Sequence, residues 1–373
     1  MDKIIISSGL SFIITFFAIP IIIQIAKEKK LFDEPNQRKI HKIVIPTLGG
    51  LGIYAGFVIA MLIFVPFYTS SCFQYYVASS LVIFFLGLKD DILVLSPTKK
   101  FLGQLIAAWI LFKFAGVQLN NMHGLFGIYQ IPNGAATVLS LFTIVVITNS
   151  FNLIDGVDGL AGSLGILTTT LFGIYFFAIG ETAHAVMAFI LTGSLISFLI
   201  YNFPPAKIFM GDTGSLLVGL MNAILVIKFI NIADTPGISY PIPSTPAIGF
   251  AILLVPLFDT LRVFSIRIFS RRSPFSPDRN HIHHLLLDLG FSHKQTTFIC
   301  LTAAIFFISL GFILRELGST VLISILFLLP LCITVLLYQY KNRRKKSNVV
   351  FSEKELVTSN KIFTLAHEPV DVD

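Results

Sequence analysis

Residues 149–161 read Asn-Ser-Phe-Asn-Leu-Ile-Asp-Gly-Val-Asp-Gly-Leu-Ala and lie between two apolar runs, 139–147 and 164–177. The stretch places Asp155 and Asp158 three residues apart, so that both acids share one side of a helical turn. Ionisable residues in or beside a membrane span are costly and by default indicate a functional site. We therefore interpret this stretch as a polar binding surface at a membrane–water boundary.

The composition of the whole chain is that of a membrane protein. Its 373 residues are 55% hydrophobic and 13% charged, with a mean hydropathy of +0.83, whereas soluble domains carry about 25% charged residues. A soluble fold cannot bury this much apolar surface, so we predict an all-α, polytopic integral membrane protein. The net charge of +7 then reflects basic cytoplasmic loops and not nucleic-acid binding. The three cysteines show no metal-ligand spacing and are interpreted as packing residues.

About eleven stretches are apolar enough to be transmembrane helices, which need about 20 residues each. We expect the first to be a retained span and not a cleaved signal peptide, because no small-residue cleavage site follows it. The predicted spans are 3–25, 48–67, 74–88, 101–117, 135–153, 160–179, 184–203, 214–232, 247–266, 296–315 and 319–340.

Lysine and arginine are concentrated in alternate loops. Basic residues fill the first loop, the loop after the ninth span and the segment 341–346. The loops that span counting places on the opposite side of the membrane are nearly free of them. The positive-inside rule therefore predicts the N-terminus outside and the C-terminus in the cytoplasm. We expect residues 1–340 to form the membrane-embedded domain. Residues 341–373 are predicted to be a basic and polar cytoplasmic tail without regular structure.

Span parity places every polar cluster on the predicted cytoplasmic side. A transporter would be expected to carry charges near mid-span, or paired broken helices in two repeated halves. The predicted spans are largely free of acids and no internal repeat is evident. Acids gathered at one interface fit chemistry between a lipid headgroup and a cytosolic substrate. The clusters are Asp90-Asp91, residues 152–158, Gly211-Asp212 and residues 278–284.

The aspartates are candidate cation ligands. Adjacent carboxylates such as Asp90 and Asp91 repel each other, so they recruit a cation or share a proton. Mg²⁺ prefers oxygen ligands and is commonly held by one or two carboxylates plus substrate phosphates. Asp212, flanked by glycine at 211 and 214, is a further candidate. The alternative for each acid is a structural one, a solvated helix end or a helix cap.

Three imidazoles follow a basic loop. His281, His283 and His284 come directly after Arg279 and Asn280. With several arginines and no cysteine nearby, phosphate contact is favoured over a zinc site, and a plain surface loop is the alternative. Carboxylates that can bind a metal ion, together with cationic side chains that can bind a diphosphate, are typical of phosphoryl-transfer enzymes.

The motifs, in order along roughly residues 1–300, resemble those of the polyprenyl-phosphate N-acetylhexosamine-1-phosphate transferases, glycosyltransferase family 4. The resemblance implies an eleven-span fold and a relationship to the phospho-MurNAc-pentapeptide translocase. The histidine pattern His-x-His-His and the pattern Asp-x-Pro-Asn-x-Arg-Lys-x-His at 33–41 resemble the GlcNAc-1-phosphate branch. One departure is that Leu93 and Val94 stand where a third aspartate is expected. The matched motifs are 33–41, 46–50, 90–91, 152–161, 211–215 and 281–284.

The resemblance implies roles for five acids. Asp212 matches the principal Mg²⁺ ligand, and Asp91 is expected beside it as a second metal ligand. Asp90 and Asp91 match the acidic pair near the metal and the lipid phosphate, one of them a possible base. Asp155 matches a catalytic-centre acid, and Asp158 an acid near uracil.

The resemblance also implies substrate contacts. Phe209 matches an aromatic residue that stacks on uracil, although packing is an equal alternative from the sequence. The loop histidines match residues near the diphosphate and the sugar. The other expected binding residues are Lys42, Asn152, Asn202 and Arg279.

The implied reaction moves GlcNAc-1-phosphate from UDP-N-acetylhexosamine to undecaprenyl phosphate and releases UMP, with Mg²⁺ or Mn²⁺. We expect a multi-pass plasma (inner) membrane enzyme with its site facing the cytoplasm and no nucleic-acid partner, and a homodimer stays open. The first alternative is the peptidoglycan translocase, with the same chemistry on a larger sugar. CDP-alcohol phosphotransferases are disfavoured because Val157-Asp158-Gly159-Leu160 follows Asp155-Gly156 where they carry a different pattern. A transporter or channel is the alternative outside enzymology.

Overall fold

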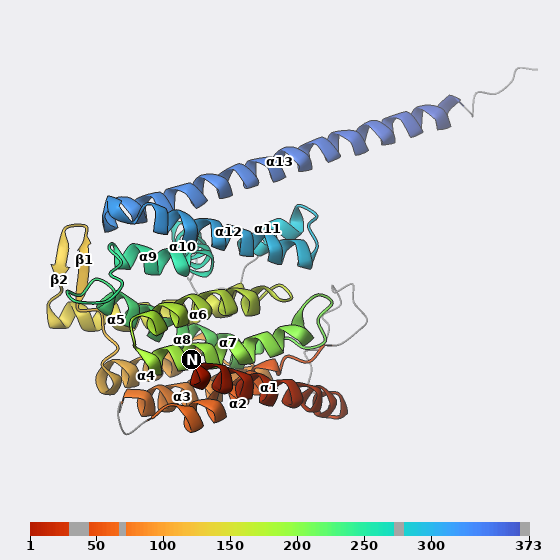
Figure 1. Cartoon of the computed structure of the whole chain (residues 1–373). Helices are drawn as coiled ribbons and strands as arrows, with labels where there is room; N and C mark the ends of the chain where they lie inside the picture. Colours follow the sequence, from red (N-terminus) through yellow and green to blue (C-terminus); the bar gives the residue numbers. More distant parts are fainter. Residues whose placement is uncertain (30–44, 67–71, 272–279, 366–373) are drawn as a thin grey trace, which may run out of the picture.

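The computed structural model describes residues 1–29, 45–66, 72–271 and 280–365. Long helices run side by side through the molecule, and a two-stranded hairpin projects at one end (Figure 1). The elements are α1 (Asp2–Glu28), α2 (Gly49–Phe64), α3 (Cys72–Ile92), α4 (Pro97–Ala115), β1 (Asn121–Leu125), β2 (Ile128–Gln130), α5 (Asn133–Ile154), α6 (Leu160–Ala178), α7 (Thr182–Asn202), α8 (Gly211–Ile232), α9 (Thr245–Ile252), α10 (Leu254–Phe269), α11 (Ile282–Asp288), α12 (His293–Ile313), a 3₁₀ turn (Arg315–Leu317) and α13 (Ser319–Leu365).

Eight of the described helices are long and apolar enough to cross a membrane, and a bent pair raises the number to nine. The pair is α9 and α10, which meet at 88°. Pro256 lies in the first turn of α10 and has no N–H for the carbonyl of Ile252, which favours a break between the two helices at this point. Each of the eleven predicted spans coincides with a helix or with this pair. A polytopic membrane protein is therefore confirmed. The count of eleven stays a prediction, because α2 has only 16 residues and α4 is not among the eight.

The loop between α4 and α5 contains the one sheet of the described chain, which the all-α prediction did not include. Strands β1 and β2 are antiparallel, with Asn121 opposite Gln130. The turn residues Phe126 and Gly127 have φ values of +52° and +76°, as the tight hairpin turn that matches strand twist requires. The amide N–H of Phe126 donates to the Thr320 hydroxyl at 2.7 Å, so the hairpin is fastened to α13.

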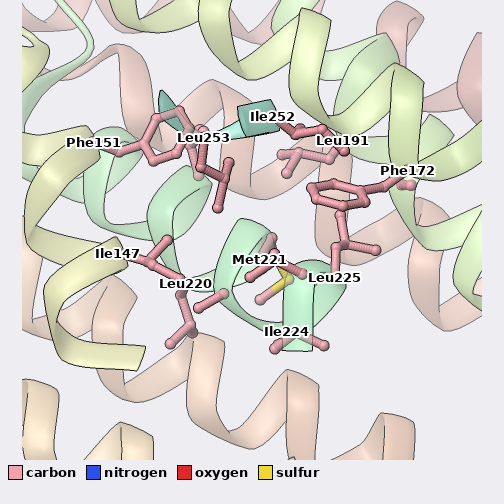
Figure 2. Packing of buried hydrophobic residues seen from close by; sticks show 14 of the residues in the cluster. Ile147, Phe151, Phe172, Leu191, Leu220, Met221, Ile224, Leu225, Ile252 and Leu253 are labelled. Carbon is pink, nitrogen blue, oxygen red and sulfur yellow. The ribbon is translucent and has the colours of Figure 1, made fainter. Parts of the chain in front are cut away.

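Helix α8 lies at the centre of the molecule. Nearly all of its residues between Thr213 and Ile230 are buried, which agrees with a sequence that is apolar on every face. Figure 2 shows α8 contributing Leu220, Met221 and Ile224 to a cluster with Phe151 of α5 and residues of α6, α7, α9 and the α9–α10 break. Because α8 is fixed on all sides, its first turn is a rigid place for a polar site.

Small residues allow close approach between the outer helices. Gly52 and Gly56 of α2 face α1, where the Thr15 hydroxyl donates to the Gly52 carbonyl at 3.1 Å. A Cβ on Gly56 would lie 2.1 Å from the Thr15 Oγ1. This is how membrane helices associate when lipid removes the hydrophobic driving force between them.

Helix α13 continues past Tyr340 to Leu365 and extends away from the other helices (Figure 1). Its lysine, arginine and glutamate residues are good helix formers, so the helix persists where the apolar sequence ends. Lys341 pairs with Asp288 of α11 at 2.7 Å. The segment predicted as a tail is thus helical as far as it is described, and the division at residue 340 stays a prediction.

Candidate active site

The start of α8 is held by the first two residues of α2. The N–H of Gly49 donates to the carbonyl of Phe209 at 2.9 Å, and the N–H of Gly50 donates to the carbonyl of Met210 at 2.8 Å. These bonds fasten the glycine pair of the 46–50 motif to the loop that leads into α8. They fix the backbone on which Asp212, the second residue of the helix, is carried.

Asp91 caps α8 from the end of α3. Its Oδ1 accepts from the N–H of Asp212 at 2.7 Å, and its Oδ2 accepts from the N–H and the hydroxyl of Thr213 at 3.0 and 2.6 Å. A carboxylate at a helix N-terminus satisfies free N–H groups and complements the helix dipole. A Cβ on Gly211 would lie 2.7 Å from Asp91 Oδ1, so glycine leaves room for the cap.

Lys100, near the start of α4, lies between two of the predicted acids. Its ammonium is 3.1 Å from Asp90 Oδ2 and also pairs with Asp212. It donates to Asn152 Oδ1 at 3.1 Å, and the Asn152 amide donates to Asp212 Oδ1 at 2.7 Å. Three separate helices, α3, α5 and α8, thus place polar side chains around one cation.

Asp155 follows directly on the last residue of α5 and is partly buried. Burial, followed by the charges of Asp212, Asp91 and Asp158, raises the pKa of Asp155 well above its usual range. A carboxyl group in this setting holds a proton readily, and it ionises more easily once a cation approaches.

The other side of the 155–159 loop is fixed by Asn202 and Asp158. The buried Asn202 accepts from the N–H of Gly159 at 2.8 Å and donates to the carbonyl of Ile208 at 2.8 Å. Asp158 Oδ1 lies 3.1 Å from His293 Nδ1 of α12. Asn202, predicted to line a substrate cleft, therefore joins two loops of the protein to each other.

The histidines belong to α11 and the residue that precedes it. His281 Nδ1 lies 2.8 Å from Asp259 Oδ2 of α10. His283 is buried, and its Nδ1 has no hydrogen-bond partner among the described residues. Burial, followed by the charge of His284, lowers the pKa of His283 to about 3, so the ring is neutral near pH 7. A Cβ on Gly156 would lie 2.4 Å from His283 Nε2, which places this ring against the 155–159 loop.

Most of the predicted residues therefore gather at one end of the bundle. Contacts join Asp91, Asn152 and Asp212 directly, Lys100 connects Asp90 to them, and His283 reaches the loop of Asp155. These contacts bring the four distant segments together at one end of the bundle. Phe209 is half-buried in the loop before α8. Lys42 and Arg279 lie outside the described residues.

Three charged residues of this region, Lys100, Asp259 and Arg262, were not predicted. Lys100 carries no distinctive signal in the sequence, and only its position between the carboxylates of Asp90 and Asp212 reveals its place in the site. Asp259 lies inside the predicted span 247–266, and an ionisable residue within a span is itself a signal of function. A charge buried within a span needs a partner of opposite charge, and Arg262, three residues later, pairs with Asp259.

The acids beside Lys100 supply oxygen donors of the kind that a hard cation prefers. No group of three or more His, Cys, Asp or Glu side chains in the described part of the chain is arranged to hold a metal by itself. Mg²⁺ is usually held by only one or two carboxylates together with substrate phosphates and water. Asp212 and Asp90, whose oxygens meet at Lys100, fit that mode of binding.

Comparison with known proteins identifies the family. Residues 73–230 match the model of glycosyl transferase family 4. The chain is 31% identical to an undecaprenyl-phosphate alpha-N-acetylglucosaminyl 1-phosphate transferase of Escherichia coli O157:H7, over 86% of each chain. It is 32% identical to a probable undecaprenyl-phosphate N-acetylglucosaminyl 1-phosphate transferase of Bacillus subtilis, over 88% of this chain and 90% of that one. It is 33% identical to a decaprenyl-phosphate N-acetylglucosaminephosphotransferase of Mycobacterium leprae, over 77% of each.

The family match covers α3 to α8, which carry Asp90, Asp91, Asn152, Asp155 and Asp212. The relatives align over most of their own length as well as most of this chain. The chain therefore belongs to glycosyl transferase family 4, together with these polyprenyl-phosphate N-acetylglucosamine-1-phosphate transferases.

Proposed function

We propose that the protein transfers GlcNAc-1-phosphate from UDP-GlcNAc to undecaprenyl phosphate and releases UMP. The names of its relatives support the acceptor and the transferred group. The observation that carries the proposal is the position of Asp212, at the N-terminus of a rigid central helix and in contact with Lys100 and Asn152. Carboxylates, a cation and a helix N-terminus at one end of a membrane bundle suit a diphosphate substrate that meets a lipid phosphate.

The proposed reaction is a single displacement. An oxygen of the lipid phosphate attacks the β-phosphorus of UDP-GlcNAc, the bond from that phosphorus to the bridging oxygen breaks, and UMP leaves with the bridging oxygen. A two-step route needs an aspartate that is free to attack phosphorus. Asp91 accepts three hydrogen bonds at the start of α8, and Asp90 accepts from the N–H of Leu95 at 2.6 Å and pairs with Lys100. Their engagement favours direct attack by the lipid phosphate.

We propose Mg²⁺ as the cofactor, with Mn²⁺ as a substitute. Asp212 and Asp90 would hold it, and the ion would neutralise charge that develops on the diphosphate. Asp91, expected from the sequence as a second ligand, is assigned instead to orienting Asp212. Asn152 holds the Asp212 carboxylate, and Lys100 lowers the cost of bringing two acids together until the substrate complex forms.

The remaining roles follow from position. His283 presents a neutral ring to the 155–159 loop and is proposed to meet the sugar or the diphosphate of the donor. Phe209, Asp158 and Asn152 are proposed to line the nucleotide end of the cleft. By the distribution of basic residues, the site faces the cytoplasm from a multi-pass protein of the plasma membrane, where a cytosolic donor reaches a lipid acceptor.

Transfer of radiolabel from a panel of UDP-sugars into extractable lipid tests the proposal. The purified protein in detergent should label undecaprenyl phosphate from UDP-GlcNAc only when Mg²⁺ or Mn²⁺ is present. Labelling from UDP-MurNAc-pentapeptide and not from UDP-GlcNAc would establish the translocase alternative. Absence of any transfer in detergent, with transport activity in vesicles, would overturn the enzymatic assignment.

Asp212→Asn is the sharpest variant for this assay. It keeps the size and the hydrogen-bond reach of the side chain but removes the charge that binds a metal. We expect turnover to be lost, since a metal–oxygen contact to a charged transition state contributes on the order of several kcal/mol. The protein should still fold, because Asp91 continues to cap α8. Turnover close to that of the unchanged protein would contradict the metal assignment.

A further inference from the structure

A buried ion pair inside α10 contacts the histidine segment of the site but has been given no role so far. Asp259 is 1% exposed and Arg262 is 6% exposed, and the Arg262 guanidinium lies 2.9 Å from Asp259 Oδ1. Replacing such a buried pair by apolar side chains often leaves stability unchanged or improves it. Stability alone is therefore a weak explanation for two charges at this depth, and their contacts point to another role.

Asp259 accepts hydrogen bonds from three donors, two of which lie at the start of α11. Besides Arg262, the backbone N–H of Ile282 donates to its Oδ1 at 2.9 Å, and His281 Nδ1 lies 2.8 Å from its Oδ2. An ionised carboxylate only accepts hydrogen bonds, so His281 Nδ1 must carry the proton and donate. One carboxylate thus fixes the ring of His281 and the backbone of Ile282, the first residue of α11.

The effect reaches the catalytic end through ring stacking. The rings of His281 and His283 stack with centroids 5.5 Å apart and planes 9° apart. The Nε2 of His283 is directed at Gly156, beside Asp155. A rotation of the His281 ring would remove the surface on which His283 rests. Because His283 has an unpartnered Nδ1, no hydrogen bond within the described residues at that atom restores its position.

We infer that Asp259 is a positioning residue, which fixes the Nδ1-protonated form and the orientation of His281 and thereby the placement of His283 against the 155–159 loop. Arg262 supports it by neutralising the carboxylate and by donating to the carbonyl of Asn280 at the same point of the chain. The expected effect on turnover rests on the transferase function proposed above. The orientation of His281 and the placement of His283 do not depend on that function.

Asp259→Asn tests the inference in steady-state kinetics. Partners that orient metal-ligating histidines typically contribute about 10–100-fold. By analogy, we expect kcat/KM for UDP-GlcNAc to fall by about tenfold or more while KM for undecaprenyl phosphate stays unchanged. In a His281→Ala background the same substitution should change kcat/KM less than about threefold, because the ring it positions is gone. If the double variant instead lost kcat/KM by the product of the two single losses, Asp259 would not act through His281.

Asp288→Asn is the matched control. It removes a carboxylate from the other end of α11, where Asp288 is 47% exposed and pairs with Lys341. An exposed ion pair contributes little, so the kinetic constants should not change. A loss equal to that of Asp259→Asn would mean that any disturbance of α11 lowers activity, and would overturn the specific role of Asp259.

A readout independent of activity is the ¹⁵N spectrum of histidine-labelled protein, in which the His281 signals are identified by their loss in His281→Ala. The unchanged protein should show His281 protonated at Nδ1, and Asp259→Asn should shift its population towards the Nε2 form. An unchanged His281 spectrum overturns the inference. If the unchanged protein transfers no sugar phosphate, the proposed function fails while this spectrum still decides the inference.

Asp259→Asn leaves the charge of Arg262 unpaired, so Asp259→Glu provides a second variant. It keeps the charge but displaces the carboxylate by one methylene, and it should fold and lose donor efficiency in the same direction. If neither variant folds, the pair is a stability element and the positioning role is excluded.

Discussion

Asp91 and Thr213 are joined by two hydrogen bonds, from the backbone N–H at 3.0 Å and from the hydroxyl at 2.6 Å, both to the same carboxylate oxygen. The pairing separates the two adjacent acids at the end of α3 into different tasks. Asp91 faces the N-terminus of α8, and Asp90 faces Lys100 at 3.1 Å. The acidic pair that the sequence shows as one unit therefore consists of a helix cap and a member of the charged cluster.

Asp91→Ala should destabilise the protein more than Asp90→Ala. Helix α8 has no side-chain cap of its own, and loss of a capping side chain costs about 0.5–2 kcal/mol. Thermal unfolding in detergent measures the difference, and the lower melting temperature is expected for Asp91→Ala. The reverse order would contradict the capping role.

Lys100→Met should strengthen metal binding. The ammonium occupies the position between Asp90 and Asp212 where a divalent cation would bind, so its removal leaves two carboxylates without a counter-charge. We expect Mn²⁺ to bind about tenfold more tightly in the absence of substrate, measured by electron paramagnetic resonance of free Mn²⁺, because close charges interact by more than about 1 kcal/mol. Lys99→Met, a neighbouring exposed lysine, is the control and should leave the affinity unchanged. Weaker binding in Lys100→Met would show that Lys100 does not compete with the ion.

Gly50→Ala should disrupt the start of α8. A Cβ on Gly50 would lie 2.1 Å from the backbone nitrogen of Gly214, and backbone at a helix contact cannot move aside cheaply. Overpacking of this kind costs about 1–3 kcal/mol or more, so both folding yield and melting temperature should fall. Gly134→Ala is the control, since nothing lies within 4 Å of its Cβ position and alanine favours the helix by up to about 1 kcal/mol. Equal behaviour of the two variants would contradict the close contact.

The sequence predicted the location of the spans well because hydropathy over about 20 residues reports the bilayer directly. It also placed the polar clusters at one end, because counting the spans between two loops tells whether they lie on the same side, without any knowledge of helix packing. It could not assign Asp91 to a helix cap or Lys100 to a carboxylate pair. Those roles depend on the approach of α3 and α4 to α8. Asp212 lies 112 positions from Lys100 and 121 from Asp91, and such separations leave no periodic signal.

Asp259 shows a different limit. Its span was predicted, but a single acid among apolar residues hardly changes the mean hydropathy, so the spans were read as largely free of acids. The hairpin β1–β2 was missed for a related reason, because a two-residue turn at Phe126 and Gly127 lacks the Asn-Gly or Asp-Gly pair that marks such turns.

The pH dependence of stability should reveal Asp155. Its pKa is raised in the folded protein, so the folded state binds the proton more tightly than the unfolded state, whose pKa is about 3.9. The charge on Asp155 therefore costs stability as the pH rises above that value, and the cost is absent below it. Asp155→Asn in metal-free protein should raise the melting temperature at pH 8 and leave it unchanged near pH 4. Asp288→Asn, at an exposed carboxylate, is the control, and a gain at pH 4 equal to that at pH 8 would contradict the assignment.

Cysteine labelling decides the orientation on which the proposed reaction depends. Contacts place Asp91, Asn152 and Asp212 at one end of the bundle, while His123 of the hairpin lies 3.2 Å from Asp234 in the loop after α8. The helix starts that follow two of the basic loops, at Gly49 and His281, lie at the first end, so that end should be cytoplasmic. Single cysteines after positions 95, 157 and 280 should react only after membrane permeabilisation, whereas those after 70, 182 and 240 should react from outside. The chain's own cysteines at 72, 300 and 332 are first replaced by serine. If position 157 reacts from outside while position 95 does not, the two acidic loops lie on opposite faces, and a cytosolic donor could not reach both.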